Sequence, residues 1–449
     1  MTNVTVDFSK ILGTIKPMHA TNNGPLYKFA QDQRVSNLEA FRAAGIPYAR
    51  NHDAAFDATY GGEHIVDVNF IFRDFSADPY LPESYDFTLT DEYLRIIELS
   101  GAKVFYRLGS KIEHWKKKYN TLPPADFNKW AVICEHIIKH YCYGWADGFR
   151  MDIKYWEIWN EADLDADDSP NKRCWGGTAK QFYELFRITL DHLKTKFPEL
   201  KIGGPAAAHV GNTKWLRGLL DSLGDIKPDF LSWHVYGANI EKVRRDVRRV
   251  REMLDDYGLT NVESILNEWN YVRGWAGDDW IYSLKQMKNH KGAAFIASTM
   301  LMCQHEPLDM LMYYDARRGA MNGMFSSDII SELLPGYYPF YMFNKLYELG
   351  TEVYTESDGG DDITAVGAVG DGGAVMLSHF NDNDSTVEKT VKVSFKGVKS
   401  ENGVRLEYYL SDKSHACELI REEIFTAENF ASYIKMPLYS QYLLKIVNL

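Results

Sequence analysis

Two glutamates have the residue type and the position that acid–base chemistry requires. Glu161 ends the segment YWEIWNE (155–161) and Glu268 lies in SILNEWN (264–270), so each follows an asparagine after a short apolar run. Runs rich in aromatic and β-branched residues indicate buried strands. A carboxyl group directly after such a strand lies at the rim of a sheet. Two of them facing each other across a cleft would form the arrangement that cleaves glycosidic bonds.

The elements that would position these groups repeat along most of the chain. Eight strand-like runs alternate with eight helical patterns, which predicts an α/β fold of the (β/α)8 TIM barrel type over residues 14–350. Reacting groups in such barrels lie at the C-terminal ends of strands, where Glu161 and Glu268 would follow the fourth and seventh. The strands are expected at 15–20, 47–51, 102–108, 154–159, 201–204, 230–234, 264–268 and 309–314. The helices are expected at 38–44, 92–100, 127–143, 179–196, 213–223, 241–257, 292–303 and 338–349, with Thr90 and Asp126 as N-caps.

The pattern changes after Gly350. Clusters of turn residues separate short alternating runs, which is typical of an antiparallel β-sandwich. Residues 4–9 also alternate, and we expect this strand to join the sandwich. The predicted domains are therefore a catalytic barrel at 14–350 and an accessory β-sandwich built from 1–13 and 351–449.

Composition narrows the class of protein. The 62 acidic and 50 basic residues give a formal charge of −12, which argues against nucleic acid or an anionic membrane as a partner. The five cysteines include no Cys-x-x-Cys pair, so neither zinc nor a disulfide framework is indicated, and no cofactor is expected. The absence of an apolar signal segment predicts a cytoplasmic protein, or a secreted or periplasmic one if a signal peptide has been removed. The sequence leaves open whether the chain forms a homo-oligomer.

Arg50 and His52 end the second predicted strand and are expected in the active site. An arginine at the inner rim can keep a nearby carboxylate ionised through paired hydrogen bonds. The alternative is a structural ion pair of Arg50 with Asp53 or Asp67.

The motifs around the two glutamates resemble those of glycoside hydrolase family 39, which contains β-xylosidases and α-L-iduronidases and belongs to a clan of retaining barrel glycosidases. The segments WEIWNEADL (156–164) and LNEWN (266–270) carry the resemblance, which extends over most of the chain. The Asn-Glu strand ends are shared across the clan. The family's usual Asn-Glu-Pro-Asn reads NEAD at 160–163, which alters the loop beside the acid and leaves the substrate open.

The resemblance implies roles for several strand-end residues. It makes Glu161 the general acid/base, Glu268 the nucleophile and Asn160 the ligand of the sugar 2-hydroxyl. His234 and Tyr236 match a His-x-Tyr stretch in which the histidine contacts the sugar and the tyrosine contacts the nucleophile. Glu161 must be protonated, and we expect repulsion from ionised Glu268 to raise its proton affinity. Retention requires carboxyl groups about 5–5.5 Å apart, against about 6.5–9.5 Å for inversion.

Aromatic residues on the same face are candidate platforms for a sugar ring. Many relatives carry a tryptophan after the eighth strand, and this sequence offers Tyr313 and Tyr314 there. Trp175, Trp275 and Trp280 fall in loops after the fourth and seventh predicted strands. The alternative for each tryptophan is loop packing.

Three further patterns do not predict a metal or ligand site. The acidic run at 163–168 lacks the glycine and glutamate of a calcium loop. His136 and His140 lack the glutamate of a zinc-protease motif and are expected at the surface. The arginine-rich segment 241–251 is interleaved with acids, which indicates a solvated helix face.

These observations predict a retaining exo-glycosidase that removes a terminal neutral sugar from an oligosaccharide or glycoside through a covalent intermediate on Glu268. The resemblance favours a β-xyloside. β-Galactosidase, β-glucosidase and α-L-arabinosidase specificities stay open, as do a transglycosylase and a non-catalytic carbohydrate-binding barrel. α-L-Iduronidase activity is disfavoured because a uronic acid needs a cationic pocket, and none is evident in the sequence.

Overall fold

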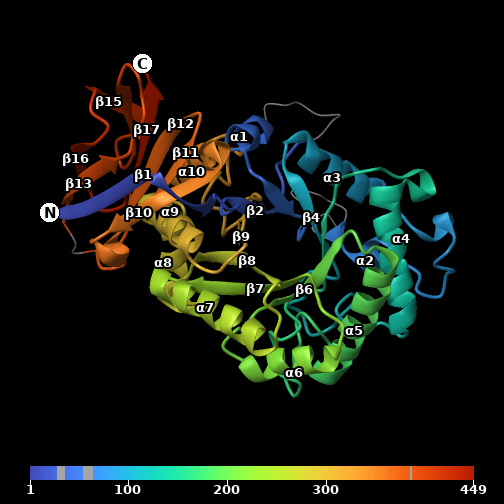
Figure 1. The fold of residues 1–449 in the computed structure, drawn as a ribbon. Coiled ribbons are helices and arrows are strands. Elements are labelled where there is room, and N and C mark those ends of the chain that lie inside the picture. The colour runs from blue at the N-terminus through green and yellow to red at the C-terminus, as the bar shows by residue number, and fades with distance from the viewer. Residues whose placement is uncertain (28–35, 54–63, 385–386) are drawn as a thin grey trace.

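The computed structural model describes residues 1–27, 36–53, 64–384 and 387–449. A barrel of parallel strands, ringed by helices, stands beside a curled β-sheet (Figure 1). None of the helices in these ranges has the length and apolar character needed to cross a bilayer.

The predicted TIM barrel is confirmed. In the described part of the chain, eight parallel strands close the barrel in chain order, and β9 pairs with β2. The strands are β2 (Ala20–Asn22), β3 (Tyr48–Arg50), β4 (Lys103–Leu108), β5 (Tyr155–Ile158), β6 (Lys201–Ala207), β7 (Phe230–Gly237), β8 (Glu263–Tyr271) and β9 (Met310–Tyr313). The first strand begins at Ala20 and not at Ile15 as expected. Pro17 lies in the expected segment and has no N–H to donate to a sheet.

Helices alternate with these strands. They are α1 (Leu38–Ala43), α2 (Val68–Ile71), α3 (Thr88–Leu99), α4 (Phe127–Tyr143), α5 (Ala179–Lys196), α6 (Thr213–Leu223), α7 (Ile240–Asp256), α8 (Gly277–Met287), α9 (His290–His305) and α10 (Tyr338–Leu349). The predicted cap at Asp126 is confirmed, because its carboxylate accepts from the backbone N–H groups of Asn128 and Lys129. The cap predicted at Thr90 is wrong. Thr90 lies inside α3, and its hydroxyl donates to the carbonyl of Ile65.

The strands outside the barrel form one nine-stranded sheet in the described residues. Its order is β15-β14-β17-β12-β11-β10-β1-β13-β16. The bounds are β1 (Thr2–Thr14), β10 (Thr351–Ser357), β11 (Ile363–Gly370), β12 (Gly372–His379), β13 (Lys389–Lys396), β14 (Val404–Ser411), β15 (Ala416–Phe425), β16 (Phe430–Met436) and β17 (Ser440–Asn448). Figure 1 shows blue β1 among the orange strands, so segments from both ends of the chain build this sheet.

The predicted β domain is confirmed, with a different internal arrangement. Its strand pairs are antiparallel except for β1 and β13, which run parallel. The sheet curls over its apolar face until its two ends meet. Ser432 on β16 lies 2.9 Å from Nη2 of Arg421 on β15 and 2.5 Å from Oη of Tyr408 on β14. One continuous sheet therefore supplies both layers of the expected sandwich.

Helix α9 joins the two parts of the molecule. It is buried from Lys291 to Gln304, as expected of a helix that has apolar neighbours on all sides. Ser298 on α9 donates to Ser378 on β12 at 3.0 Å. Nζ of Lys291 lies 2.9 Å from Asp382 and 2.8 Å from Asp384, so a buried cation is paired across the junction.

The inside of the barrel divides into an apolar floor and a polar top. The floor is a separate buried cluster of strand residues: Ala20, Phe105, Tyr155, Phe230, Ile265, Met310 and Met312. Fully buried charged side chains, Arg50 and Glu157, lie in the polar part, where the site is found.

Candidate active site

The backbone after β5 turns so that two consecutive side chains face the same cavity. Trp159 and Glu161 have left-handed φ angles of 70° and 48°, a conformation that non-glycine residues seldom adopt. The buried indole of Trp159 fixes this turn by donating to the carbonyl of Cys174 at 2.9 Å. Gly109 permits the close approach, since a Cβ there would lie 2.9 Å from Cα of Trp159. As a result Asn160 and Glu161 both line the cavity.

A bulge in β8 has the same effect on the second Asn-Glu pair. Trp233 pairs with Leu266 and His234 with Glu268, so Asn267 is an extra residue between two ladder pairs. A regular strand would send Asn267 and Glu268 to opposite faces. Here Asn267 donates to Glu157 inside the barrel, while Glu268 reaches the cavity.

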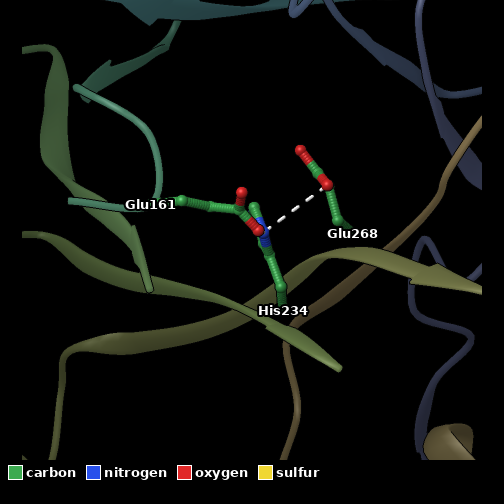
Figure 2. Close-up of side chains that lie close together, drawn as sticks. All are labelled: Glu161, His234 and Glu268. Carbon is green, nitrogen blue, oxygen red and sulfur yellow. Dashed lines mark hydrogen bonds and ion pairs between the residues drawn. The ribbon is translucent and has the colours of Figure 1, made fainter. Parts of the chain in front are cut away.

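The structure brings Glu161 and Glu268 together. Three atoms, one carboxyl oxygen of each glutamate and one ring nitrogen of His234, lie within 4.8 Å of one another (Figure 2). Nδ1 of His234 lies 2.8 Å from Oε1 of Glu161 and 3.5 Å from Oε2 of Glu268. This separation of the carboxyl groups is near the value of about 5–5.5 Å for retention and below the range of about 6.5–9.5 Å for inversion.

Glu268 receives strong hydrogen bonds that Glu161 lacks. Nη1 of Arg50 lies 2.8 Å from its Oε1, and the hydroxyl of Tyr236 donates to Oε2 at 2.8 Å. Arg50 is fully buried, and it also donates to Glu157 and Asn160, each at 2.7 Å. Because the Oδ1 atom of Asn160 accepts from Arg50, its amide nitrogen is the group left to offer to a ligand.

The alternative ion pairs of Arg50 with Asp53 or Asp67 are not found. Nη2 of Arg107 lies 2.8 Å from Asp67. Asp53 lies 3.3 Å from Lys111 and 3.4 Å from Arg317.

Different surroundings set the pKa values of the two glutamates. Burial raises the pKa of Glu161 to about 7, against the opposing charges of Arg50 and His209. Burial is thus the main cause, and not the repulsion from Glu268 that we expected. Burial also raises the pKa of Glu268, while His234, Arg50 and the Tyr236 hydroxyl lower it. The hydrogen bonds favour the negative charge on Glu268 and the proton on Glu161.

A cavity of about 880 Å³ opens above the two carboxyl groups. Six of the predicted binding residues line it: His52, Asn160, His234, Tyr236, Tyr314 and Trp275. Nε2 of His52 lies 3.7 Å from Oε1 of Glu268.

Trp275 and Trp175 have opposite environments. Trp275 is 59% exposed at the cavity, and its ring meets those of Tyr236 and Trp280 at 5.0 and 5.3 Å. Trp175 is only 3% exposed and packs against Trp159, away from the cavity wall. The prediction of a platform at Trp175 is therefore wrong. Its loop folds back into the core.

The atoms that could hold a metal ion belong to the same cluster. Glu161, His234 and Glu268 offer three ligand atoms at suitable spacing. Arg50 lies in contact with Glu268 and would repel a bound cation, so proton chemistry suits the cluster better. His136 and His140, which we expected at the surface, are buried. Nε2 of His140 lies 3.0 Å from the carboxylate oxygen Oδ1 of Asp91, so the buried ring has a polar partner.

Two functional features escaped the sequence analysis. Glu157, a buried carboxylate that shares Arg50 with Glu268, was signalled only by its charge within an apolar strand. The second is the segment 241–251 of α7, which was predicted as a solvated helix face. Lys242, Arg245 and Arg249 on it line the cavity.

The fold and the site together define a barrel enzyme with two facing carboxyl groups. The sequence model of Glycosyl hydrolases family 39 matches residues 3–273, more than half of the chain. The chain belongs to this family of O-glycosyl hydrolases.

The chain is also similar to individual proteins. A β-xylosidase of Geobacillus stearothermophilus is 26% identical over 207 residues, which are 43% of this chain and 36% of that protein. A β-xylosidase of Caldicellulosiruptor saccharolyticus is 25% identical over 245 residues, 53% of this chain and 46% of that protein. The matches span less than half the length of either relative. The structure of a glucosidase from Croceicoccus marinus shares the fold, with a TM-score of 0.81 and 21% identity over 100% of this chain and 99% of that one.

Proposed function

We propose that this protein is a retaining exo-glycosidase that releases a terminal neutral sugar, with a β-xyloside as substrate. The observation that carries the proposal is the pair of carboxyl groups within 4.8 Å, of which only Glu268 contacts Arg50 and Tyr236. This difference in hydrogen bonding between the two carboxyl groups is typical of a nucleophile paired with a general acid. The two relatives named β-xylosidase support the choice of sugar.

In the first step, the ionised carboxylate of Glu268 attacks the anomeric carbon. The bond from this carbon to the leaving oxygen breaks, and that oxygen takes the proton of Glu161. The product is an ester between the sugar and Glu268. Loss of charge on Glu268 weakens its attraction to Arg50, and the new charge appears on Glu161, whose pKa of about 7 suits both of its forms.

In the second step, water enters on the side that the leaving group has vacated. Glu161, now a carboxylate, takes a proton from this water as its oxygen attacks the anomeric carbon. Glu268 departs as a carboxylate, and Arg50 and Tyr236 stabilise the charge as it returns. Nδ1 of His234 lies 2.8 Å from Oε1 of Glu161, and burial lowers the pKa of this histidine.

The cavity offers matched contacts for a sugar ring. Asn160 lines the cavity, and its amide nitrogen can donate to a hydroxyl. The exposed face of Trp275 can cover apolar C–H groups of a sugar. His52 and Tyr314 close the side beside Glu268, with ring centres 6.1 Å apart.

A trapping experiment tests the mechanism. The protein is incubated with a 2-fluoro glycoside that carries a good leaving group, and digested peptides are examined by mass spectrometry. We expect the sugar on Glu268. An unlabelled Glu268, together with activity that survives Glu268→Gln, would contradict the proposal. A panel of nitrophenyl glycosides, with xyloside first, identifies the sugar.

The two glutamates serve as controls for each other. In Glu161→Ala, azide should restore turnover of aryl glycosides and give a glycosyl azide of the same anomeric form as the substrate. In Glu268→Ala, azide replaces the nucleophile, and its product should have the opposite form. Identical products from both variants would remove the assigned roles. A complete lack of turnover in the unaltered protein would favour a carbohydrate-binding barrel.

A further inference from the structure

One sector of the cavity wall is basic, although the chain as a whole is acidic. The side chains concerned follow β5, β6 and β7 or the neighbouring loop after β4, and they are His114, Arg173, His209, Lys242, Arg245 and Arg249. Three of them lie on one face of α7, at spacings of three and four residues. Val243, Val247 and Val250 on the opposite face are buried and hold the helix in place.

The acids nearby do not cancel this charge. Asp246 is the acidic residue of α7 that lines the cavity, and it serves both Lys242, at 3.2 Å, and Arg249. Asp165 balances Arg173 at 2.7 Å. Arg245 is exposed and forms no hydrogen bond or ion pair with the described residues. The N-terminal end of α7, which points to the same cavity, adds partial positive charge. The α7 wall therefore carries an excess of about two positive charges in a protein whose formal charge is −12.

The strand order places these basic residues on the arc of the barrel that starts at Glu161, because Arg173, His209 and α7 follow β5, β6 and β7. The glycosidic oxygen that takes the proton of Glu161 belongs to the leaving group, so that group extends to the side of Glu161 that faces away from Glu268. Arg173 adjoins Cys174, whose Sγ lies 3.8 Å from Oε2 of Glu161. His52 and Tyr314, in contrast, come from the ends of β3 and β9 on the other side of the cavity, beside Glu268.

We propose that the leaving group of the natural substrate carries an anionic substituent, a carboxylate or a sulfate, which Arg245, Lys242 and Arg249 bind. The proposal rests on the proposed function and adds the class of substrate: an acidic saccharide from which a neutral terminal sugar is removed. The terminal sugar stays neutral, because Arg50, the cation in contact with Glu268, is already paired with Glu157 and Glu268. The cationic surface that the sequence did not reveal is thus present, on the leaving-group side.

Transfer of the enzyme-bound sugar to different acceptors tests the proposal, because the same leaving group has departed in every case. The enzyme is first converted to its 2-fluoroglycosyl form, and recovery of activity is then followed with glucose, glucuronate or glucose 6-sulfate as acceptor. Each acceptor occupies the leaving-group side. We expect an anionic acceptor to act at about tenfold lower concentration than glucose, and 0.5 M salt to remove most of this advantage. A better response to glucuronate indicates a carboxylate, and a better response to the sulfate indicates a sulfate ester.

Two arginines on the same helix supply a matched pair of variants. Arg245→Gln removes the unpaired charge at the cavity and should reduce the preference for the anion by about threefold. Arg248→Gln removes the same charge from a residue that pairs with Glu306 at 2.7 Å, away from the cavity, and should keep the preference. Thermal unfolding of both variants checks that they are folded.

The outcomes separate this inference from the proposed mechanism. Equal response to glucose and to both anions would overturn the inference, while the adduct on Glu268 would still stand. If Arg245→Gln kept the full preference for the anionic acceptor, the inference would also be overturned, because other residues would then bind the anion. Failure to form the adduct at all would count against the mechanism.

Discussion

Nη1 of Arg50 lies 2.8 Å from Oε1 of Glu268, and both side chains are almost completely buried, at 0% and 6% exposure. The same guanidinium contacts Glu157, so two buried carboxylates depend on one cation. Arginine stays protonated in proteins, and the planar fork reaches both partners at once. The Arg50–Glu268 ion pair therefore stabilises both the folded barrel interior and the ionised form of Glu268.

Arg50→Gln should reduce stability as well as activity. Removal of the cation leaves two carboxylates unpaired in the interior, and loss of one member of a buried pair costs about 3–5 kcal/mol. We expect a matching fall in the free energy of unfolding by urea. Arg42→Gln is the control, since its pair with Glu39 is exposed and is worth less than about 1 kcal/mol. Equal effects of the two changes would contradict the role given to Arg50.

The pH dependence of activity should report the proton on Glu161. Burial raises its pKa to about 7, and the acid form is the one that donates. Activity measured as kcat/KM should therefore fall as the pH rises through about 7 and be retained below that value until Glu268 becomes protonated. The alkaline limb should vanish in Glu161→Gln with substrates whose leaving group needs no proton. An unchanged limb in this variant would assign it to another group.

Tyr236→Phe should slow catalysis with little effect on folding. Burial and the charge of Glu268 hold the pKa of Tyr236 well above its usual value, so the hydroxyl stays a donor to Oε2. A hydrogen bond to a charged group is worth about 1.5–3 kcal/mol, which corresponds to a fall in kcat of about 10- to 100-fold. Tyr314→Phe is a control that loses a hydroxyl at the same cavity, but one that donates to Asp53. A smaller loss in Tyr236→Phe than in Tyr314→Phe would argue against this account.

The two loop tryptophans should respond to substitution in opposite ways. Trp275→Ala removes an exposed ring at the cavity, so KM should rise several-fold with a small change in melting temperature. Trp175→Ala empties a buried site and should cost about 3–5 kcal/mol of stability. Thermal melts and aryl glycoside kinetics of both variants measure the contrast. A stable Trp175→Ala protein with raised KM would restore Trp175 as a sugar platform.

Local sequence patterns were enough to predict the barrel. Helices α4, α5, α6 and α10 begin and end at the predicted residues, because apolar periodicity and capping are local properties. Asn160 and Glu161 follow β5 as predicted, whereas Asn267 and Glu268 lie inside β8, which continues to Tyr271. The joint presence of Glu161 and Glu268 in one cavity follows from the rule that a parallel barrel gathers the C-terminal ends of its strands.

Features that depend on contacts between distant segments were not predictable. Trp175 is buried because its loop folds against Trp159, and nothing in its own neighbourhood signals that depth. Periodicity predicted α7 but did not show that Arg245 and Arg249 overhang the cavity, since this depends on how the barrel closes. The bulge at Asn267, which turns Glu268 toward the cavity, is also a backbone feature without a residue signature.

The place of β1 between β10 and β13 has a consequence for biosynthesis. A ribosome completes β1 before the barrel, yet neither of its hydrogen-bonded neighbours exists until residues 351–396 have emerged. At about 5–20 residues per second, the finished strand waits on the order of 20–80 s with both edges open. During this delay β1 is a ready site for chaperones or for wrong pairing between nascent chains, so its alternation of apolar and polar residues affects yield as well as the final fold.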